Sequence, residues 1–285
     1  MVELCKVKIT FFVAVSTSVG YIIYSGKINL EMIAAAFGVF ILASGSSALN
    51  EYQEREYDAL MERTKNRPIP SGMISSNNAL IISVAMLLAG SGIIYLVSNI
   101  TSMLLGLLAF VWYNIIYTPL KRKNVMAVVP GSLIGAIPPV IGWTAAGGNP
   151  LDLHIITVAL FFFIWQIPHF WLLLLIYGND YSAGGFPTLT KKFSNGQLSR
   201  ITFIWIAALA VSGLLIPISN VSPNIFSLLA IIFLGIWLLM DTRKILTQYL
   251  EKINFRKAFV TVNLYVLAII IVISIDQLFI KEFYR

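Results

Sequence analysis

The residues best suited to chemistry lie in a short polar stretch of an otherwise apolar sequence, NEYQEREYDALMERTKNRPIPSG from Asn50 to Gly72. Asn50, Glu54 and Asp58 are spaced four residues apart, so a helix would place their side chains in one stripe. Eight residues of helix rise about 12 Å, which is enough to line one wall of a pocket mouth. The spacing therefore predicts a row of oxygen ligands on one helix face.

Three cations follow this row directly, Arg63, Lys65 and Arg67, before Pro68 and Pro70 end any helix. Oxygen ligands beside cations suit a magnesium-bound diphosphate, because carboxylates hold the metal and Arg or Lys binds the phosphate oxygens. A solvated helix face in a charged loop between membrane helices is an equally good interpretation of three residues at this spacing.

A second polar loop begins at Tyr117 and carries Lys121 and Arg122. Pro119 is predicted to break the helix here, so that both cations turn inward as a second phosphate clamp. The alternative, favoured by these residues alone, is a basic cluster that snorkels from a helix end to the membrane surface.

A third polar segment places Gln166 and His169 inside an apolar span, where polar groups are costly and usually face the protein interior. Pro168 is predicted to kink this span, and Asp180 and Tyr181 follow it. His169 could be a haem ligand, a proton carrier or a hydrogen-bonded core histidine. The residues by themselves favour the core histidine.

The composition identifies a polytopic helical membrane protein: 58% of residues are hydrophobic, 12% are charged and the mean hydropathy is +0.83. About a quarter of the residues of a soluble protein are charged. The net charge of +7 reflects cations in loops and does not indicate nucleic acid. Cys5 is the only cysteine, which excludes an intrachain disulfide and a cysteine-based metal site.

Apolar runs of about 20 residues predict an all-α chain with nine transmembrane helices. The expected spans are 7–24, 30–50, 78–98, 100–117, 125–146, 153–177, 200–219, 224–241 and 258–280. The third and fourth meet near Asn99 and should form a hairpin. Small residues in the second span and the Pro and Gly residues of the fifth predict close helix packing. A weak internal symmetry suggests two four-helix units plus one helix, with the cavity between them.

The distribution of Lys and Arg sets the expected orientation. With the N-terminus in the cytoplasm, every Lys and Arg except Lys27, Lys281 and Arg285 falls on the inner side. All three polar segments then open on the cytoplasmic face.

The three segments together resemble a known family, the UbiA superfamily of intramembrane prenyltransferases. Asn50-x3-Glu54-x3-Asp58, with residues 61–64 and 67–72, resembles its first acidic signature, and Tyr117-x3-Lys121 is similar to its Tyr-x3-Lys motif. Residues 135–143, 165–171 and 180–184 resemble the branch that makes haem O. The likeness covers about residues 45 to 190.

The resemblance implies one domain over residues 1–285, with nine transmembrane helices around a central cavity in the cytoplasmic membrane. It implies transfer of a farnesyl group from farnesyl diphosphate to a vinyl group of haem b, with magnesium as cofactor. The implied partners are these substrates, the lipid bilayer and haem A synthase or terminal oxidase assembly, without nucleic acid.

The resemblance also assigns roles to residues. The implied catalytic residues are Asn50, Glu54, Asp58, Lys121 and Tyr117. The implied metal ligands are Asn50, Glu54, Asp58 and Asp180, and the implied substrate-binding residues are Arg63, Arg67, Arg122, Gln166, His169, Asp180 and Tyr181. Two positions depart from the family pattern. Glu54 stands where Asp is usual, and Gly184 replaces the second acid after Asp180. Asp180 is therefore expected to bind one magnesium or to pair with Lys191 or Arg200.

Two other functions fit the same sequence. A related enzyme could prenylate a quinone precursor or another aromatic acceptor, although the segment from Trp165 to Trp171 favours haem. A transporter could use an acidic loop, although such proteins carry their acids deep within a span.

Overall fold

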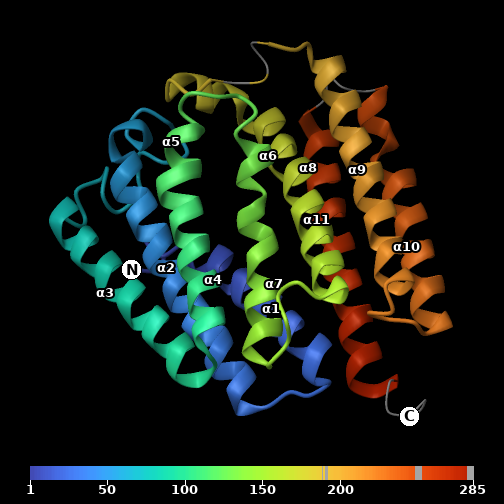
Figure 1. Cartoon of the computed structure of the whole chain (residues 1–285). Coiled ribbons are helices and arrows are strands. Elements are labelled where there is room, and N and C mark those ends of the chain that lie inside the picture. The colour runs from blue at the N-terminus through green and yellow to red at the C-terminus, as the bar shows by residue number, and fades with distance from the viewer. Residues whose placement is uncertain (188, 190–191, 248–251, 281–285) are drawn as a thin grey trace. The chain divides into compact units, whose positions relative to one another are not determined.

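A computed structural model describes residues 1–187, 189, 192–247 and 252–280, and all regular structure within these ranges is helical (Figure 1). The helices are α1 (Val7–Ser25), α2 (Leu30–Asp58), α3 (Ser76–Val97), α4 (Ile100–Val111), α5 (Thr118–Leu120), α6 (Val128–Gly131), α7 (Leu133–Ala145), α8 (Leu153–Ala183), α9 (Asn195–Ile218), α10 (Ile225–Thr242) and α11 (Lys252–Ile275). π-helical turns occupy Trp112–Tyr117 and Asp276–Ile280, and a 3₁₀ turn occupies Arg243–Leu246.

The all-α prediction is confirmed for the described part of the chain, which contains nine helical segments long and apolar enough to cross a membrane. They divide into two compact units. The first unit comprises residues 1–127, 137–150 and 179–187, and the second comprises 128–136, 151–178 and 188–285. Both α7 and α8 contribute residues to the two units, so the division does not follow whole helices, and the expected two four-helix units plus one helix stay a prediction. The central cavity stays a prediction.

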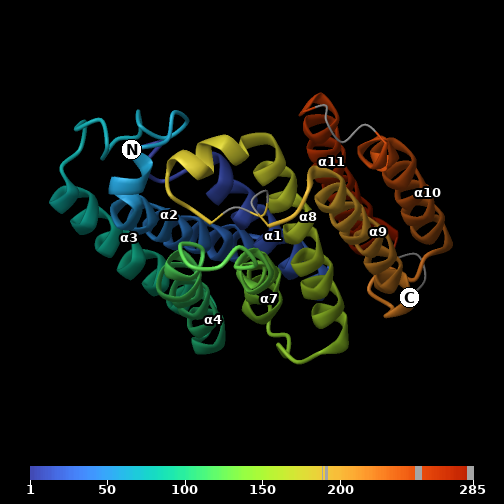
Figure 2. The ribbon, with the colours of Figure 1, turned by 90° about the horizontal axis from the view of Figure 1, so that it is seen from above.

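Helix α2 is central to the first unit and runs beside α3 (Figure 1 and Figure 2). The two helices approach closely, since a Cβ atom at Gly90 would lie 2.4 Å from the Leu42 backbone nitrogen. The Asn29 side chain caps the start of α2 by accepting from the Met32 N–H at 2.9 Å. The helix continues to Asp58, past the predicted end at residue 50, because its polar extension is rich in the good helix formers Glu, Gln and Arg.

The fifth predicted span also packs closely on its neighbour, as expected. A Cβ atom at Gly20 would lie 1.8 Å from the Pro139 carbonyl oxygen, and one at Gly142 would lie 1.7 Å from the Thr17 carbonyl oxygen. Side chains at these glycines would therefore force α1 and α7 apart.

The hairpin of α3 and α4 is confirmed, with Asn99 capping α4 by accepting from the Ser102 N–H at 2.9 Å. The predicted break at Pro119 is wrong, because the helical path continues through Pro119 to Leu120. The irregularity precedes the proline. In the π-helical turn, the Thr118 N–H bonds to the Tyr113 carbonyl five residues back. This wider turn accommodates a residue that has no N–H of its own.

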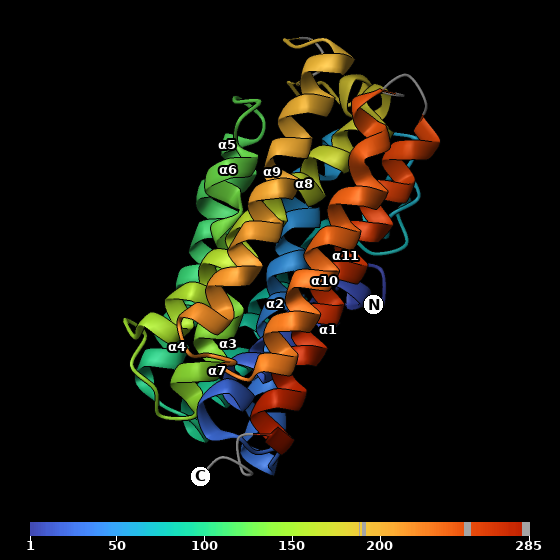
Figure 3. The same ribbon diagram turned by 90° about the vertical axis from the view of Figure 1, so that its right-hand side faces the viewer.

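In the second unit, α9, α10 and α11 lie side by side (Figure 3). Helix α8 passes through Pro168, and its departure from helical dihedrals lies at Tyr177, with φ −115° and ψ 20°. The helix thus breaks nine residues after the proline, just before Asp180, and the kink expected at Pro168 stays a prediction. Ser194 and Gln197 form a capping box at the start of α9.

Candidate active site

The predicted stripe occupies the last turns of α2 and is buried. Asn50 is 1% exposed, Glu54 is 4% exposed and Asp58 is 1% exposed. Unpaired charges are rarely buried to this degree, because desolvation costs several kcal/mol. The interpretation as a solvated helix face is therefore wrong.

Each member of the stripe has its own cation. Lys6 Nζ donates to Asn50 Oδ1, Lys121 Nζ to Glu54 Oε2 and Arg67 Nη1 to Asp58 Oδ2, each at 2.7 Å. These cations come from three separate places: the segment before α1, the end of α5 and the loop after α2. The first unit thus gathers three oxygen acceptors and three positive charges within one row.

The oxygen atoms of the stripe suit a hard divalent cation. Glu54 Oε1 is buried without a hydrogen-bond partner, and the Asn50 amide is fixed by its donation to Thr118 Oγ1 at 3.1 Å. Carboxylate and amide oxygens are the ligands that magnesium uses in proteins. Among the described residues, however, no three acidic, histidine or cysteine side chains converge as a metal cluster. The oxygen atoms of Asn50, Glu54 and Asp58 are of the kind that binds magnesium. In this structure one oxygen of each residue is bonded to a cation, Lys6, Lys121 or Arg67.

The loop after α2 is fastened to that helix by two internal contacts. Thr64 Oγ1 donates to the Asp58 carbonyl at 2.9 Å, and Glu51 Oε1 accepts from the Ile69 N–H at 3.1 Å. Glu51 is fully buried. Ile69 follows Arg67 by two residues, so Glu51 fixes the turn that carries the guanidinium to Asp58.

Asp180 also holds this loop, since its carboxylate accepts from the backbone N–H groups of Glu62 at 3.1 Å and Arg63 at 3.3 Å. The Arg63 guanidinium lies 5.8 Å from the centre of the Tyr181 ring. These contacts bring together the two acidic segments that the sequence separates. The pairing expected with Lys191 lies outside the described residues, and metal binding by Asp180 stays a prediction.

Packing explains why the second acidic segment has Gly184 in place of an acid. Gly184 is buried, and a Cβ atom there would lie 2.8 Å from Met61 Cγ. A carboxylate side chain at this position would have to displace Met61, which is itself 4% exposed.

Tyr117 and Arg122 take different places. The Lys121 ammonium lies 5.6 Å from the Tyr117 ring centre and 5.8 Å from that of Phe186, so aromatic faces flank it. Arg122 Nη2 donates to the Gln53 carbonyl at 2.6 Å, and its guanidinium lies over the Tyr57 ring at 4.7 Å. Arg122 thus braces α2, whereas Lys121 reaches the stripe.

Residues 12–265 match the family model described as the UbiA prenyltransferase family. The chain belongs to the UbiA prenyltransferase family. Among relatives, the chain is 42% identical to "Protoheme IX farnesyltransferase" of Geobacter sulfurreducens over 70% of this chain and 73% of that protein. It is 29% identical to a protein of the same name from Oleidesulfovibrio alaskensis, over 97% of this chain and 95% of that one.

Solved members of the family share the fold. A digeranylgeranylglyceryl phosphate synthase superposes with a TM-score of 0.78 at 17% identity, over 97% of each chain. A UbiA homologue from Archaeoglobus fulgidus bound to GPP and Mg²⁺ superposes with a TM-score of 0.66 at 14% identity, over 96% of this chain and 99% of that one.

Two other predicted site residues of this family member, Gln166 and His169, lie in the second unit. His169 Nδ1 is 2.9 Å from Asn263 Oδ1, and Asn263 Nδ2 donates to the Phe259 carbonyl at 2.6 Å. Since the Asn263 nitrogen faces a carbonyl, its oxygen must face the imidazole and accept from Nδ1–H. Gln166 packs on Gly135, where a Cβ atom would lie 2.4 Å from Gln166 Nε2.

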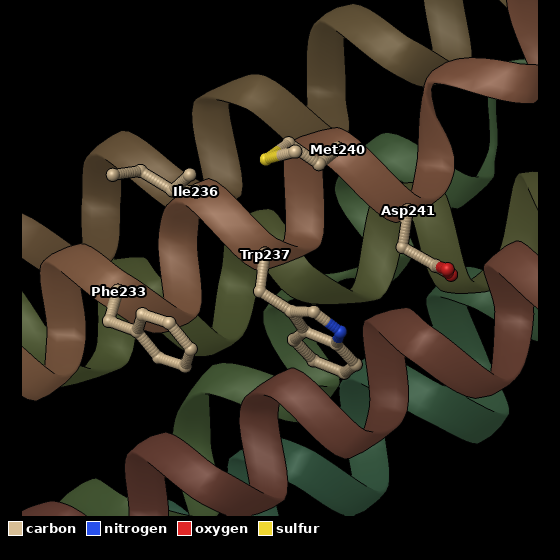
Figure 4. Close-up of a pocket in the computed structure, with 5 residues that line it drawn as sticks. All are labelled: Phe233, Ile236, Trp237, Met240 and Asp241. Carbon is tan, nitrogen blue, oxygen red and sulfur yellow. The ribbon is translucent and has the colours of Figure 1, made fainter.

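A groove of about 310 Å³ on α10 is lined by Phe233, Ile236, Trp237, Met240 and Asp241 (Figure 4). Its only charged group is the Asp241 carboxylate, which bonds to Lys257 and Thr261, each at 2.6 Å. A satisfied carboxylate beside apolar side chains gives this groove no reactive group.

Three residues at these sites, Lys6, Glu51 and Asn263, are not predicted by the sequence patterns. Lys6 contributes only to the expected membrane orientation, and Glu51 lies outside the four-residue spacing. Asn263 could have been predicted, because a polar residue within an apolar span often faces another polar group.

Burial, together with the charges of Arg67 and Lys121, lowers the pKa of the Lys6 ammonium to about 7.

Proposed function

We propose that this protein transfers a farnesyl group from farnesyl diphosphate to a vinyl group of haem b, which makes haem O and releases diphosphate. The observation that carries the proposal is the buried stripe of Asn50, Glu54 and Asp58 with a cation on each member. The relatives called protoheme IX farnesyltransferase support haem as the acceptor.

The proposed ligands of magnesium are Asn50, Glu54, Asp58 and, from the second acidic segment, Asp180. When bound, magnesium supplies Lewis acidity that weakens the bond between the farnesyl carbon and the diphosphate oxygen. Lys121 and Arg67 bind phosphate oxygens and stabilise the negative charge that builds on the leaving group. Arg63 adds a further charge, and Tyr117 orients the phosphate end through the Lys121 ammonium on its ring.

The bond changes balance without a redox partner. The electrons of the broken C–O bond leave with diphosphate, and the vinyl group of haem b forms the new C–C bond. Water adds to the resulting cation and loses a proton, which gives the hydroxyethylfarnesyl side chain. Burial of the stripe keeps water away from the allylic carbon before the vinyl group attacks.

For the acceptor, we assign His169 to haem. With Nδ1–H bonded to Asn263, the Nε2 atom carries the lone pair, which is the tautomer an iron ligand requires. The rings of Trp165 and Phe259, at 5.2 Å and 4.8 Å from the imidazole, offer apolar faces to a porphyrin. Gln166, one helix turn away, is the second proposed haem contact.

The proposed location is the cytoplasmic membrane, with the N-terminus and the acidic segments on the cytoplasmic side, as the distribution of Lys and Arg favours. Haem A synthase and terminal oxidase assembly are the proposed users of the product.

The test is turnover by purified protein in detergent with farnesyl diphosphate, haem b and magnesium, followed by mass spectrometry of the extracted haem. We expect the mass of haem O, and loss of the product when EDTA replaces magnesium. Prenylation of a phenolic acceptor with haem left unchanged would assign the protein to another branch of the family.

A further inference from the structure

Lys6 lies in the short segment that precedes α1, and its backbone is unusual. Its dihedrals are φ 47° and ψ 48°, the left-handed region that lysine rarely adopts. Such a conformation persists where surrounding contacts require it, often at functional sites.

The contacts that hold this segment are apolar. Leu4 is fully buried in a cluster with Ala48, Ile69 and Ala79, and Cys5 is 4% exposed. These partners lie on α2, on α3 and in the loop that carries Arg67. The segment is thus packed against the helix that carries the stripe and against the loop that carries Arg67, and Lys6 enters the site from a fixed backbone.

The hydrogen bond of Lys6 differs from those of the other two cations. Lys121 and Arg67 bind carboxylates, whereas Lys6 binds the neutral amide oxygen of Asn50. Asn50 Oδ1 is also the atom that a metal would use, because Asn50 Nδ2 is committed to Thr118. A metal at Asn50 Oδ1 would place a divalent charge beside the Lys6 ammonium, and the repulsion between them favours departure of the ammonium from this oxygen.

The displaced ammonium would remain close to the metal. A phosphate oxygen bound to the same metal would be a neighbour of Asn50 Oδ1, the atom that Lys6 Nζ contacts at 2.7 Å. Phosphate oxygens are also much stronger acceptors for an ammonium group than an amide oxygen is.

We propose that Lys6 is a further diphosphate-binding residue, which holds the Asn50 oxygen in the metal-free protein and moves to a phosphate oxygen when metal and diphosphate bind. This inference rests on the proposed function. It makes the binding of metal and diphosphate interdependent, since the ammonium opposes the metal alone and favours the metal together with diphosphate.

The test uses the full chain in detergent, with the variants Lys6→Met, Lys6→Arg and Lys8→Met. Lys8 is the matched control, because it is an exposed lysine two residues further along. Two affinities are measured: that for Mn²⁺ alone, and that for the non-transferable analogue farnesyl thiodiphosphate in saturating magnesium.

In Lys6→Met we expect the analogue to bind at least tenfold more weakly, while Mn²⁺ alone binds as tightly as in the wild type or more tightly. Lys8→Met should resemble the wild type in both measurements, and Lys6→Arg should retain most of the affinity for the analogue.

Unchanged analogue binding in Lys6→Met would overturn the proposal. An equal loss of both affinities would also overturn it, because a general disturbance of the segment weakens every ligand. Failure of the wild-type protein to bind the analogue with magnesium would instead remove the proposed function itself, which separates the two failures.

Discussion

Lys121 and Glu54 lie 67 residues apart in the sequence, and an ion pair of 2.7 Å joins them in the first unit. The Glu54 carboxylate is 5% exposed and its second oxygen has no hydrogen-bond partner, so the pair is the main compensation for a buried charge. The Tyr-x3-Lys segment and the first acidic segment therefore form one site.

Replacing Lys121 with Gln should remove most haem O formation and destabilise the protein by about 3 kcal/mol, because Glu54 is left buried without a cation. The double variant Lys121→Gln/Glu54→Gln should recover much of the stability and none of the activity. Thermal unfolding in detergent and product analysis measure the two effects separately. Equal stability of the single and double variants would contradict this account of the pair.

Asp58→Asn should lower the rate of haem O formation at least a hundredfold, since a carboxylate at a proposed metal ligand is lost. Glu56→Gln is the control, because Glu56 lies on the same helix turn and is exposed. Steady-state rates with magnesium in excess test both variants. A wild-type rate for Asp58→Asn would remove Asp58 from the mechanism.

Glu51→Ala should weaken binding of the diphosphate analogue and lower stability by about 1–3 kcal/mol, because the Ile69 N–H loses its buried acceptor. Glu51→Gln keeps an acceptor oxygen at this position and should retain more of both properties. The difference in affinity and stability between Glu51→Gln and Glu51→Ala measures how far Glu51 positions the turn that carries Arg67. Identical affinity and stability of the two variants would argue against this positioning role.

Asn263→Leu should alter the visible spectrum of bound haem b, because the His169 ring loses the acceptor that fixes its Nδ1–H tautomer. Asn263→Asp, which retains an acceptor oxygen, should keep the wild-type spectrum. His169→Ala gives the reference spectrum without the ligand. If His169→Ala leaves the spectrum unchanged, iron ligation by His169 is ruled out.

Gly142→Ala should destabilise the protein by at least about 1–3 kcal/mol, because the added methyl group would meet the Thr17 backbone of α1. Gly92→Ala is the matched control, since a Cβ atom there meets nothing within 4 Å. Removing a helical glycine at an open position should stabilise the helix by roughly 0.5–1 kcal/mol. Thermal unfolding of both variants in one detergent measures these effects: the unfolding temperature should fall in Gly142→Ala and rise in Gly92→Ala.

The sequence predicts the helices and the stripe because both follow from periodicity: about 20 apolar residues span a membrane, and a spacing of four aligns Asn50, Glu54 and Asp58. It offers Arg67 and Lys121 as phosphate-binding cations from their own segments, but it joins them and Asp180 into one site only through the family resemblance, since no local rule pairs residues across so many positions.

Other features depend on tertiary packing and are invisible to pattern. The entry of Lys6 into the site depends on its contact with Asn50, 44 residues away. The π-helical turn before Pro119 and the break at Tyr177 likewise follow no apolar periodicity. The role of Glu51 cannot be predicted from residue types, because its partner is the Ile69 backbone N–H and every residue except proline carries such a group.

The end of α2 has one more electrostatic property. The peptide dipoles of a helix sum to about half a negative charge at the C-terminus, and Glu54 and Asp58 add two carboxylates there. Acidic side chains are unfavourable at this pole, so the helix end is stable only when cations surround it. The backbone itself therefore attracts a divalent ion, and the last turns of α2 should fray first when its counter-charges are removed.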